Sequence, residues 1–203
     1  MSVIVLATGN PHKVKELAPL LQGAGYDVKL QTDFFNDEVE EDGLSFVENA
    51  IKKARYASKR TGLPAIADDS GLEVDALNGQ PGIYSARYAS GELSNVTDEH
   101  NLQKVLDELG DLPYKDRTAR YSCVVVYVEH ANDPMPIIGF GHWYGEILKA
   151  RRTTFGVGYD PIFWVPQLVK TLSEVPVEVK NKISHRAKAI KQVLEALEHK
   201  STR

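Results

Sequence analysis

The hydrophobic pattern at the start of the chain predicts a strand, a helix and a second strand in that order. Residues 3–7 are continuously apolar and rich in β-branched side chains, which is typical of a strand buried on both faces. From Pro11 onward the apolar residues recur at helical spacing, until Gly23 ends the pattern. Residues 26–31 then return to a strand pattern, so the chain begins with alternating strands and helices.

Helical and extended patterns continue to alternate along the rest of the chain. The predicted helices cover residues 45–60, the stretch from Thr97 to Leu109, and residues 184–199. The predicted strands cover residues 65–67, 72–77, 119–129 and 137–148. The last two strands are joined by a short polar link with two prolines, residues 130–136, which predicts an antiparallel hairpin. Residues 33–43 are acidic and irregular, and residues 80–91 are rich in turn formers.

This order of elements predicts a mixed α/β fold around a central sheet. The length of 203 residues suits one domain, or at most two small lobes around a shared core. The sequence contains no internal repeat, low-complexity tract or linker, and it does not place a boundary between lobes. We therefore expect residues 1–203 to fold as one domain.

Charge and cysteine content argue against several classes of protein. Lys and Arg number 24 against 28 Asp and Glu, so the net charge is −4, which argues against broad binding to nucleic acid or to an anionic membrane. One local basic pocket remains compatible with this balance. The single cysteine, Cys123, cannot form an intrachain disulfide, and no apolar stretch reaches the ~20 residues of a membrane span. The chain begins without a secretion-signal pattern, so we expect it in the reducing cytoplasm.

An anion site is predicted where the first strand gives way to the first helix. Thr8, Gly9 and Asn10 stand at this junction, where backbone N–H groups and the positive end of the helix dipole face outward. Lys13 adds a positive charge one turn into the helix. The segment has the glycine pattern of neither the P-loop nor the dinucleotide-binding turn. The alternative is an ordinary turn followed by a solvated lysine.

Two groups of carboxylates are candidates for a magnesium site. The acidic segment 37–42 is rich in the oxygen ligands that Mg²⁺ prefers, although a solvated acidic loop has the same composition. Asp68 and Asp69 end an apolar strand, where buried carboxylates need a cation or hydrogen bonds; the alternative is an Asp-rich turn. Because neighbours in a strand point to opposite faces, we expect one of the two to bind a metal and the other to face a different group.

A further set of charged residues lies late in the chain. Residues 158–161 read Gly-Tyr-Asp-Pro, and Lys180, His185 and Arg186 follow them. Lys and Arg bind phosphate, and His185 can hydrogen-bond a base or a phosphate. Ser184 can equally cap the last helix and leave the next two residues exposed. Anion-binding turns, cations and carboxylates for a metal together favour a nucleoside triphosphate as the ligand.

Motifs along the chain occur in an order that resembles a known family. They are Thr-Gly-Asn-Pro-His-Lys (8–13), Glu-Asn-Ala (48–50), Ala-Asp-Asp-Ser-Gly-Leu (67–72), Pro-Gly-Ile-Tyr-Ser-Ala-Arg (81–87), Gly-Tyr-Asp-Pro-Ile-Phe (158–163) and Ser-His-Arg (184–186). With these motifs the chain resembles the inosine/xanthosine triphosphate pyrophosphatase family, whose enzymes remove non-canonical purine nucleotides. The resemblance runs over nearly the whole chain.

The resemblance implies an elongated α/β fold, in which a mixed central sheet with flanking helices forms two lobes around a substrate cleft. It implies a homodimer that hydrolyses dITP, ITP and XTP to the nucleoside monophosphate and pyrophosphate with Mg²⁺. Asp69 is then the catalytic proton acceptor, and Glu40 and Asp69 serve the metal. The residues implied to bind the substrate are Thr8, Gly9, Asn10, Lys13, Lys53, Ser70, Gly158, Tyr159, Asp160, Lys180, His185 and Arg186.

Physical chemistry refines two of these implied roles. A carboxylate bound to Mg²⁺ has a lowered pKa and is a weak base, so we interpret Asp69 mainly as the group that orients a metal-activated water. A donor such as Arg186 or Lys180 aimed at the 6-keto oxygen would favour hypoxanthine and xanthine over adenine, which carries an amino group at that position.

One segment departs from the family pattern. The family has a glycine-rich stretch before Gly-Tyr-Asp, whereas residues 149–157 read Lys-Ala-Arg-Arg-Thr-Thr-Phe-Gly-Val. Val157 stands where an aromatic ring would stack on the base, and Phe155 either substitutes for it or leaves the stacking weaker. The alternative functions are therefore a related nucleotide pyrophosphatase with another base preference and a non-catalytic nucleotide-binding protein.

Overall fold

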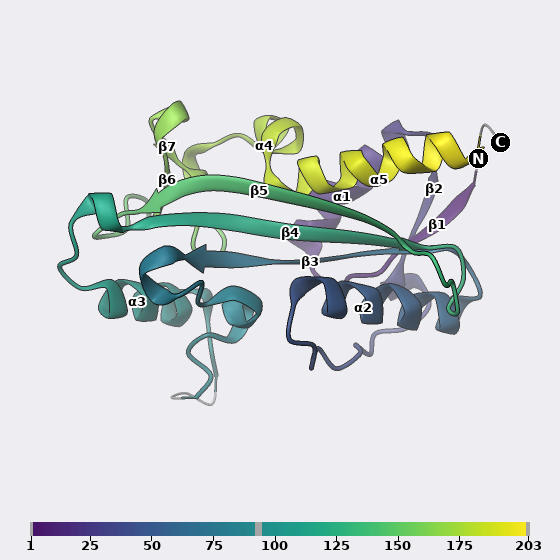
Figure 1. Ribbon diagram of the computed structural model, residues 1–203, viewed down its shortest axis with the longest axis horizontal. Coiled ribbons are helices and arrows are strands. Elements are labelled where there is room, and N and C mark those ends of the chain that lie inside the picture. The colour runs from purple at the N-terminus through teal and green to yellow at the C-terminus, as the bar shows by residue number, and fades with distance from the viewer. Residues whose placement is uncertain (1, 92–94, 202–203) are drawn as a thin grey trace. The chain divides into compact units, whose positions relative to one another are not determined.

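A seven-stranded sheet organises the computed structural model, which describes residues 2–91 and 95–201 (Figure 1). The strands are β1 (Val3–Leu6), β2 (Asp27–Leu30), β3 (Ala65–Val74), β4 (Thr118–Val128), β5 (Ile137–Ile147), β6 (Phe163–Val165) and β7 (Lys170–Thr171). They lie in the order β2-β1-β3-β4-β5-β6-β7. β1 is parallel to β2 and β3, whereas β6 is antiparallel to β5 and β7. The sheet is therefore mixed, as predicted.

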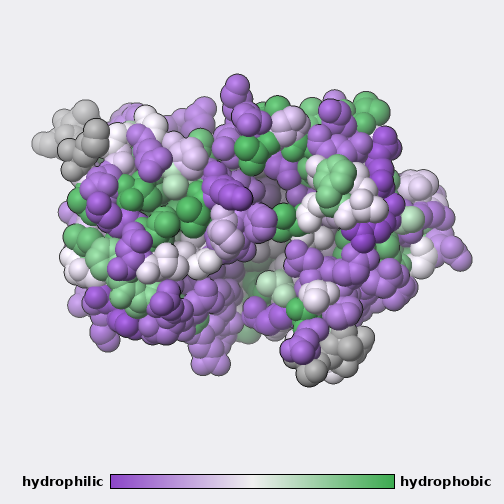
Figure 2. Space-filling view, turned by 180° about the vertical axis from the view of Figure 1, so that it is seen from behind, coloured by the Kyte–Doolittle hydropathy of each residue, from purple (hydrophilic) through white to green (hydrophobic). Residues whose placement is uncertain are grey.

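Helices connect the first four strands and end the described chain. The α-helices are α1 (Pro11–Gly23), α2 (Phe46–Thr61), α3 (Asp98–Leu109), α4 (Val177–Ile183) and α5 (His185–Ser201). The 3₁₀-helices are η1 (Gln31–Asp33), η2 (Asp75–Leu77), η3 (Gly82–Arg87), η4 (Tyr114–Asp116), η5 (Pro166–Leu168) and η6 (Leu172–Glu174). Over the described ranges, every helix is too short or too polar to span a membrane. On the face shown in Figure 2, hydrophilic residues predominate and hydrophobic ones form separate patches.

β4 and β5 form the predicted antiparallel hairpin. They are neighbours in the sheet and are joined by the short link of residues 129–136. The backbone N–H of Ile147, at the end of β5, donates to the carbonyl of Arg117, just before β4, at 2.9 Å. This pairing of the end of one strand with the start of the other is antiparallel, because a parallel pair would need a much longer crossover.

The prediction of two separate strands at residues 65–67 and 72–77 is wrong. β3 is one strand that continues without a break through Asp68 and Gly71, and residues 75–77 form a 3₁₀-helix instead of extending it. An Asp-rich turn does not form, because cations on the neighbouring helices neutralise the two carboxylates and let the strand continue.

The chain divides into two compact units. Unit 1 consists of Met1–Asp69, Cys123–Gly141 and Val177–Arg203, and unit 2 consists of Ser70–Ser122 and His142–Pro176. β3, β4 and β5 contribute residues to both units. The expectation that residues 1–203 fold as one domain stays a prediction.

In unit 1, side chains that alternate along β1 and β3 build a core on each face of the sheet. Ile4 and Ile66 pack with residues of α1 and α5 on one face, whereas Val5 and Ala65 pack with residues of α2 on the other. Figure 1 shows α1 and α5 on one side of these strands and α2 on the opposite side. Position along β3 therefore decides which helices a side chain meets: residues 66 and 68 share one face, and residues 67 and 69 share the other.

Unit 2 has its own core beneath α3. Leu102 and Val105 of α3 pack with Leu72 of β3, Ile147 of β5 and Phe163 of β6. The spacing of these apolar residues along α3 agrees with the predicted helix, and Thr97 caps it by accepting a hydrogen bond from a backbone N–H of the first turn.

A buried arginine ties three backbone segments of unit 2 together. Arg117 is fully buried, and its guanidinium donates to the carbonyls of Ile147, Gly110 and Leu148 at 2.8, 3.0 and 3.0 Å. Burial lowers the pKa of Arg117 because it disfavours the charged form. The three carbonyl oxygens offset part of the cost of burying the charge, because they accept from its N–H groups. The end of α3 and the end of β5 are thereby held at one point.

Candidate functional site

Two adjacent carboxylates in β3 face opposite sides of the sheet. Asp68 shares its face with Ile66, toward α1 and α5, and Asp69 shares its face with Ala67, toward α2. Both are buried, with 1% and 6% of their surface exposed. Their ion pairs involve different helices, as the alternation of side chains along a strand predicts. That one of the two carboxylates binds a metal stays a prediction.

On the α1 and α5 side, Asp68 holds two cations. Its Oδ2 lies 3.0 Å from Nζ of Lys13 and 3.3 Å from Nε of Arg186. Arg186 is fixed a second time, because its Nη1 lies 2.8 Å from Oε2 of Glu16. Burial alone would raise the pKa of the Asp68 carboxyl, but the charges of Lys13 and Arg186 outweigh burial and hold the pKa well below its usual range. Asp68 is therefore ionised at neutral pH.

The start of α1 has the shape of an anion site. Asn10 caps the helix by accepting from the backbone N–H of His12 at 2.9 Å, and Thr8 accepts from the N–H of Asn10 at 3.1 Å. A β-carbon at Gly9 would lie 2.9 Å from Oε1 of Glu38, so glycine lets the acidic loop approach this turn closely. Thr8, Gly9, Asn10 and Lys13 are thus gathered around one helix start, with positive potential from the helix dipole and the lysine.

The start of α5 is buried against β5. Ser184 caps the helix by accepting from the N–H of Ala187 at 3.1 Å, as the sequence allowed. His185 and Arg186 are nevertheless not exposed: His185 is 6% exposed and the Arg186 side chain 16%. Burial, reinforced by the charge of Arg186, lowers the pKa of His185 well below its ordinary value, so its imidazole is neutral. Its nearby charges also include Lys180 of α4.

Two glycines of β5 make this burial possible. A β-carbon at Gly141 would collide with the carbonyl of His185, and one at Gly139 would collide with the carbonyl of Ala189. Glycine therefore lets the first turns of α5 lie directly on the strand. Two glycines at alternate positions of a predicted strand indicate that another backbone approaches that face closely. This contact of Gly139 and Gly141 was not predicted from the sequence.

On the α2 side, Asp69 meets a single lysine. Nζ of Lys53 lies 3.0 Å from Oδ1 of Asp69 and 3.2 Å from Oε1 of Glu41. Burial tends to lower the pKa of Lys53, but the charges of Asp69, Asp68 and Glu41 raise it overall, so the lysine is a firm cation. Burial raises the pKa of Asp69 and the lysines only partly offset this. Among the described residues, Oδ2 of Asp69 is buried and accepts no hydrogen bond.

This arrangement fits a magnesium ion. The orphaned Oδ2 of Asp69 needs a cation or a donor, and the two sides of β3 together hold three cations, Lys13, Lys53 and Arg186, against four carboxylates. Within residues 2–91 and 95–201, no three His, Cys, Asp or Glu side chains gather into a complete ligand set. Mg²⁺ does not require a complete set of protein ligands, because it commonly uses one or two carboxylates together with water and substrate phosphates.

In the acidic loop, the glutamate that pairs with Lys53 is not the glutamate that the resemblance implies at the metal. Glu41 forms the ion pair, whereas the neighbouring Glu40 is exposed. The role of Glu40 at the metal stays a prediction. Neither Glu41 nor Glu16 was singled out from the sequence, although Glu16 follows Lys13 by three residues and so lies on the same helical face.

The remaining predicted residues belong to unit 2. Gly158 has φ of +55°, and its N–H donates to Oδ2 of Asp98 at 2.7 Å. Tyr159 is 3% exposed, and its hydroxyl donates to the carbonyl of Ser85 at 2.7 Å, so its ring anchors the segment in the core. The carboxylate of Asp160 accepts from the hydroxyl of Tyr121 at 3.4 Å. Ser70 is half-buried in β3.

The segment that departs from the family pattern is held by side chains. Arg152 pairs with Glu174 at 3.2 Å, and the hydroxyl of Thr153 lies 2.7 Å from that of Ser173. Phe155 follows with 61% of its surface exposed. The contacts of Arg152 and Thr153 therefore restrain a backbone segment that a glycine-rich sequence would leave flexible. The ring of Phe155 remains in solvent.

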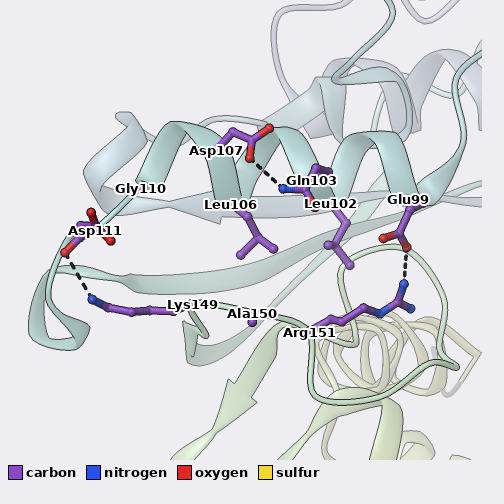
Figure 3. A pocket seen from close by; sticks show the side chains of 10 residues that line it. All are labelled: Glu99, Leu102, Gln103, Leu106, Asp107, Gly110, Asp111, Lys149, Ala150 and Arg151. Atoms are coloured by element: carbon purple, nitrogen blue, oxygen red, sulfur yellow. Dashed lines mark hydrogen bonds and ion pairs between the residues drawn. The ribbon is translucent and has the colours of Figure 1, made fainter.

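Unit 2 also contains a pocket of about 540 Å³ between α3 and residues 149–151 (Figure 3). Leu102 and Leu106 form its apolar part. Arg151 pairs with Glu99 at 2.5 Å at one end, and Lys149 donates to the carbonyl of Asp111 at 3.3 Å at the other. The site residues predicted from the sequence all lie in described ranges, and the lining includes none of them. The pocket is therefore separate from the carboxylates of β3.

The sequence matches a family model over most of its length. The model of the Ham1 family covers residues 4–196. A dITP/XTP pyrophosphatase of Shigella flexneri is 57% identical to this chain over 197 residues, which cover 97% of the chain and 98% of that relative. The dITP/XTP pyrophosphatase of Escherichia coli strain K12 is 55% identical over the same share of both chains.

Solved structures agree with the fold. A HAM1 protein from Coxiella burnetii superposes with a TM-score of 0.88 and 46% identity, covering 98% of this chain and 100% of that one. The Ham1 protein of Staphylococcus aureus gives a TM-score of 0.84 and 40% identity with the same coverage. Both solved structures therefore share the fold of this chain and a large part of its sequence.

Proposed function

The chain belongs to the Ham1 family, and from that premise we propose that it is a dITP/XTP pyrophosphatase. It hydrolyses dITP, ITP and XTP to the nucleoside monophosphate and pyrophosphate, and so removes non-canonical purine nucleotides from the nucleotide pool. Relatives of that name align with nearly all of the chain, and the order of its motifs supports the same activity.

The observation that carries this function is the half-satisfied carboxylate of Asp69. One oxygen is fixed by Lys53, and the other is buried without a partner in the described chain. An unpaired buried acceptor is costly, and a water or a cation bound in the site would satisfy it. A water bound at Oδ2 of Asp69 would donate to an acceptor that is fixed in place. A phosphate group next to that water would lie near the ammonium group of Lys53.

The triphosphate binds through the positive groups around β3. Thr8, Gly9 and Asn10 line the start of α1, where the helix dipole is positive, and Lys13 and Lys53 supply the nearby charges. Both lysines stabilise the negative charge that develops on the α-phosphate and on the departing pyrophosphate. Ser70 lies next to Asp69 in β3 and contributes a hydroxyl to the phosphates.

Asp69 prepares the attacking water. The water oxygen forms a bond to the α-phosphorus, the bond from that phosphorus to the α–β bridging oxygen breaks, and pyrophosphate leaves. Burial raises the pKa of Asp69, which opposes the lowering that a bound Mg²⁺ would bring to this carboxylate. Asp69 and Glu40 would hold Mg²⁺, which supplies Lewis-acid stabilisation of the phosphoryl oxygens when bound. Asp69 orients the water and shares its proton.

The base is recognised by the remaining predicted residues. Asp68 and Glu16 hold Arg186 on the side of β3 where Asp68 also holds Lys13, so we assign Arg186 to the triphosphate and Lys180 to the 6-keto oxygen. His185 is a neutral imidazole that can donate or accept. Gly158, Tyr159 and Asp160 shape the base-binding segment. The homodimer, the two lobes around a cleft and the cytoplasmic location belong to this proposal as well.

Pyrophosphate release tests the proposed function. The purified chain is assayed with dITP, ITP, XTP, dTTP and ATP, each with Mg²⁺ and with a chelator. We expect release from the first three, little from dTTP and ATP, and loss of activity on chelation. Faster release from dTTP or ATP would indicate a pyrophosphatase with another base preference. Binding of dITP without release of pyrophosphate would indicate a non-catalytic nucleotide-binding protein.

A further inference from the structure

We propose that Asp68 is a positioning residue, whose carboxylate holds Lys13 and Arg186 in the places from which they receive the triphosphate. The inference rests on the proposed function and adds a role for the carboxylate that faces away from Asp69. Asp68 lies in unit 1 together with Lys13 and Arg186, so both of its ion pairs lie within one compact unit.

The geometry requires a group that holds two like charges together. Oδ2 of Asp68 lies 3.0 Å from Nζ of Lys13 and 3.3 Å from Nε of Arg186, so a single oxygen joins them. Lys13 stands in the first turn of α1 and Arg186 in the first turn of α5. The positive end of each helix dipole therefore adds to the repulsion between the cations. A buried anion between them offsets both effects.

The carboxylate also fixes the direction of the lysine. A lysine ammonium has three donors on a flexible four-carbon stem, and one donor is directed to Asp68. The lysine side chain is 16% exposed, so its ammonium remains within reach of solvent or a ligand. Holding Lys13 before the ligand arrives removes the entropy cost of ordering this side chain on binding.

The charge of Asp68 and its geometry predict opposite effects on anion binding. If Asp68 only contributed negative charge, its neutralisation would strengthen the binding of a polyphosphate, because one repulsive charge would be gone. If Asp68 positions the cations, the same change weakens binding, because Lys13 and Arg186 separate and lose their fixed directions. The sign of the change therefore distinguishes the two roles.

The test compares the wild-type chain with Asp68→Asn, which keeps the side-chain shape and removes the charge. Binding of inorganic tripolyphosphate is measured by calorimetry without added metal, so that the protein's cations alone are probed. We expect binding at least tenfold weaker in Asp68→Asn, and Asp68→Glu is expected to restore part of the loss. Equal or tighter binding in Asp68→Asn overturns the proposal.

A double-mutant cycle with Lys13→Met separates positioning from general damage. In the Lys13→Met background, Asp68→Asn is expected to weaken tripolyphosphate binding much less than in the wild type, because one of its two cations is already gone. Fully additive losses would contradict the proposal. Val126→Ala, which truncates a buried core residue of unit 1, is the control for lost stability and is expected to leave tripolyphosphate binding unchanged.

Glu16→Gln keeps the proposal testable if Asp68→Asn does not fold. This change frees Arg186 from its second carboxylate but leaves both cations paired with Asp68, so the protein is expected to fold. Weaker tripolyphosphate binding supports positioning of the cations by carboxylates, and unchanged or tighter binding opposes it. Failure of the proposed function looks different: the wild type then releases no pyrophosphate from dITP, whatever the result for tripolyphosphate.

Discussion

The two sides of β3 treat their buried carboxylates differently. On the α1 and α5 side, Asp68 meets two cations, and one of them is held again by a second carboxylate. On the α2 side, Asp69 meets one cation, Lys53, at its Oδ1. In the described chain, Oδ1 of Asp68 and Oδ2 of Asp69 are both buried and accept no hydrogen bond, so the difference lies in the number of cations. The pKa values follow the same division: cations lower the pKa of Asp68, and burial raises that of Asp69.

The two carboxylates therefore differ in how many cations they hold before a ligand binds. A carboxylate that pairs with two cations before a ligand arrives organises those cations, whereas one that pairs with a single cation and keeps a raised pKa remains available for chemistry. The alternation of side chains along one strand creates both environments from adjacent residues. Substitutions that affect the two sides separately test this interpretation.

The largest effect is expected on the Asp69 side. Asp69→Asn keeps an oxygen that can accept from Lys53 and removes the charge that orients and deprotonates water. We expect kcat for dITP to fall by about 10³-fold or more, within the usual contribution of a general base, while dITP binding stays within a few-fold. Steady-state kinetics and calorimetric binding measure the two quantities. A variant that keeps a near-normal kcat would refute the assigned role.

On the Asp68 side the largest expected loss is in stability. Asp68→Asn leaves two buried cations without their shared anion, so we expect the free energy of unfolding at neutral pH to fall by about 3 kcal/mol. Urea unfolding followed by circular dichroism measures the change. Lys191→Met, at a largely exposed lysine of α5, is the control and is expected to change it by less than about 0.5 kcal/mol.

The stability loss at Asp68 depends on pH with a definite sign. The folded pKa of Asp68 is lowered, so its contribution is present above the unfolded pKa of about 3.9 and is lost as the pH falls toward the folded value. The gap between wild type and Asp68→Asn is therefore expected to be constant from pH 8 to about 5 and to shrink below pH ~4. A gap that grew on acidification would contradict an ionised Asp68.

The sequence predicted that Asp68 and Asp69 face opposite sides because strand geometry is local. Alternation along residues 65–69 requires only that the segment is extended, so the opposite directions of Asp68 and Asp69 followed without knowledge of their partners. Helical spacing likewise placed α1, α2, α3 and α5 correctly to within a few residues. The hairpin of β4 and β5 followed from the length of the link.

Long-range partners could not be predicted in the same way. The ion pair of Lys53 with Glu41 rather than a neighbouring acid depends on the path of an irregular loop. The continuity of β3 through Asp68 to Gly71 depends on cations from helices distant in the sequence, which override the turn propensity of these residues. Arg117 lies in a polar stretch of the sequence, yet it is fully buried and donates to three backbone carbonyls that the sequence does not identify.

A smaller effect is expected in base selectivity. Lys180→Met removes the donor assigned to the 6-keto oxygen, so the preference for dITP over dATP in kcat/KM is expected to fall about tenfold, equivalent to ~1.4 kcal/mol. Lys191→Met again serves as the control, because this lysine lies on the exposed surface of α5. An unchanged preference would assign the donor to another residue.

The smallest effect concerns the segment that departs from the family pattern. Val157 is 39% exposed and Phe155 61%, so a ring at residue 157 can be added without entering the core. Val157→Phe is expected to lower KM for dITP three- to tenfold, because stacking of a base on an aromatic ring contributes about 1–3 kcal/mol. If Phe155 already supplies the stacking, Phe155→Ala raises KM by a similar factor and Val157→Phe changes little. Tripolyphosphate binding is the control, because this ligand has no base: it should be the same in both variants, and a change there would show that the segment acts on the phosphates instead of the base.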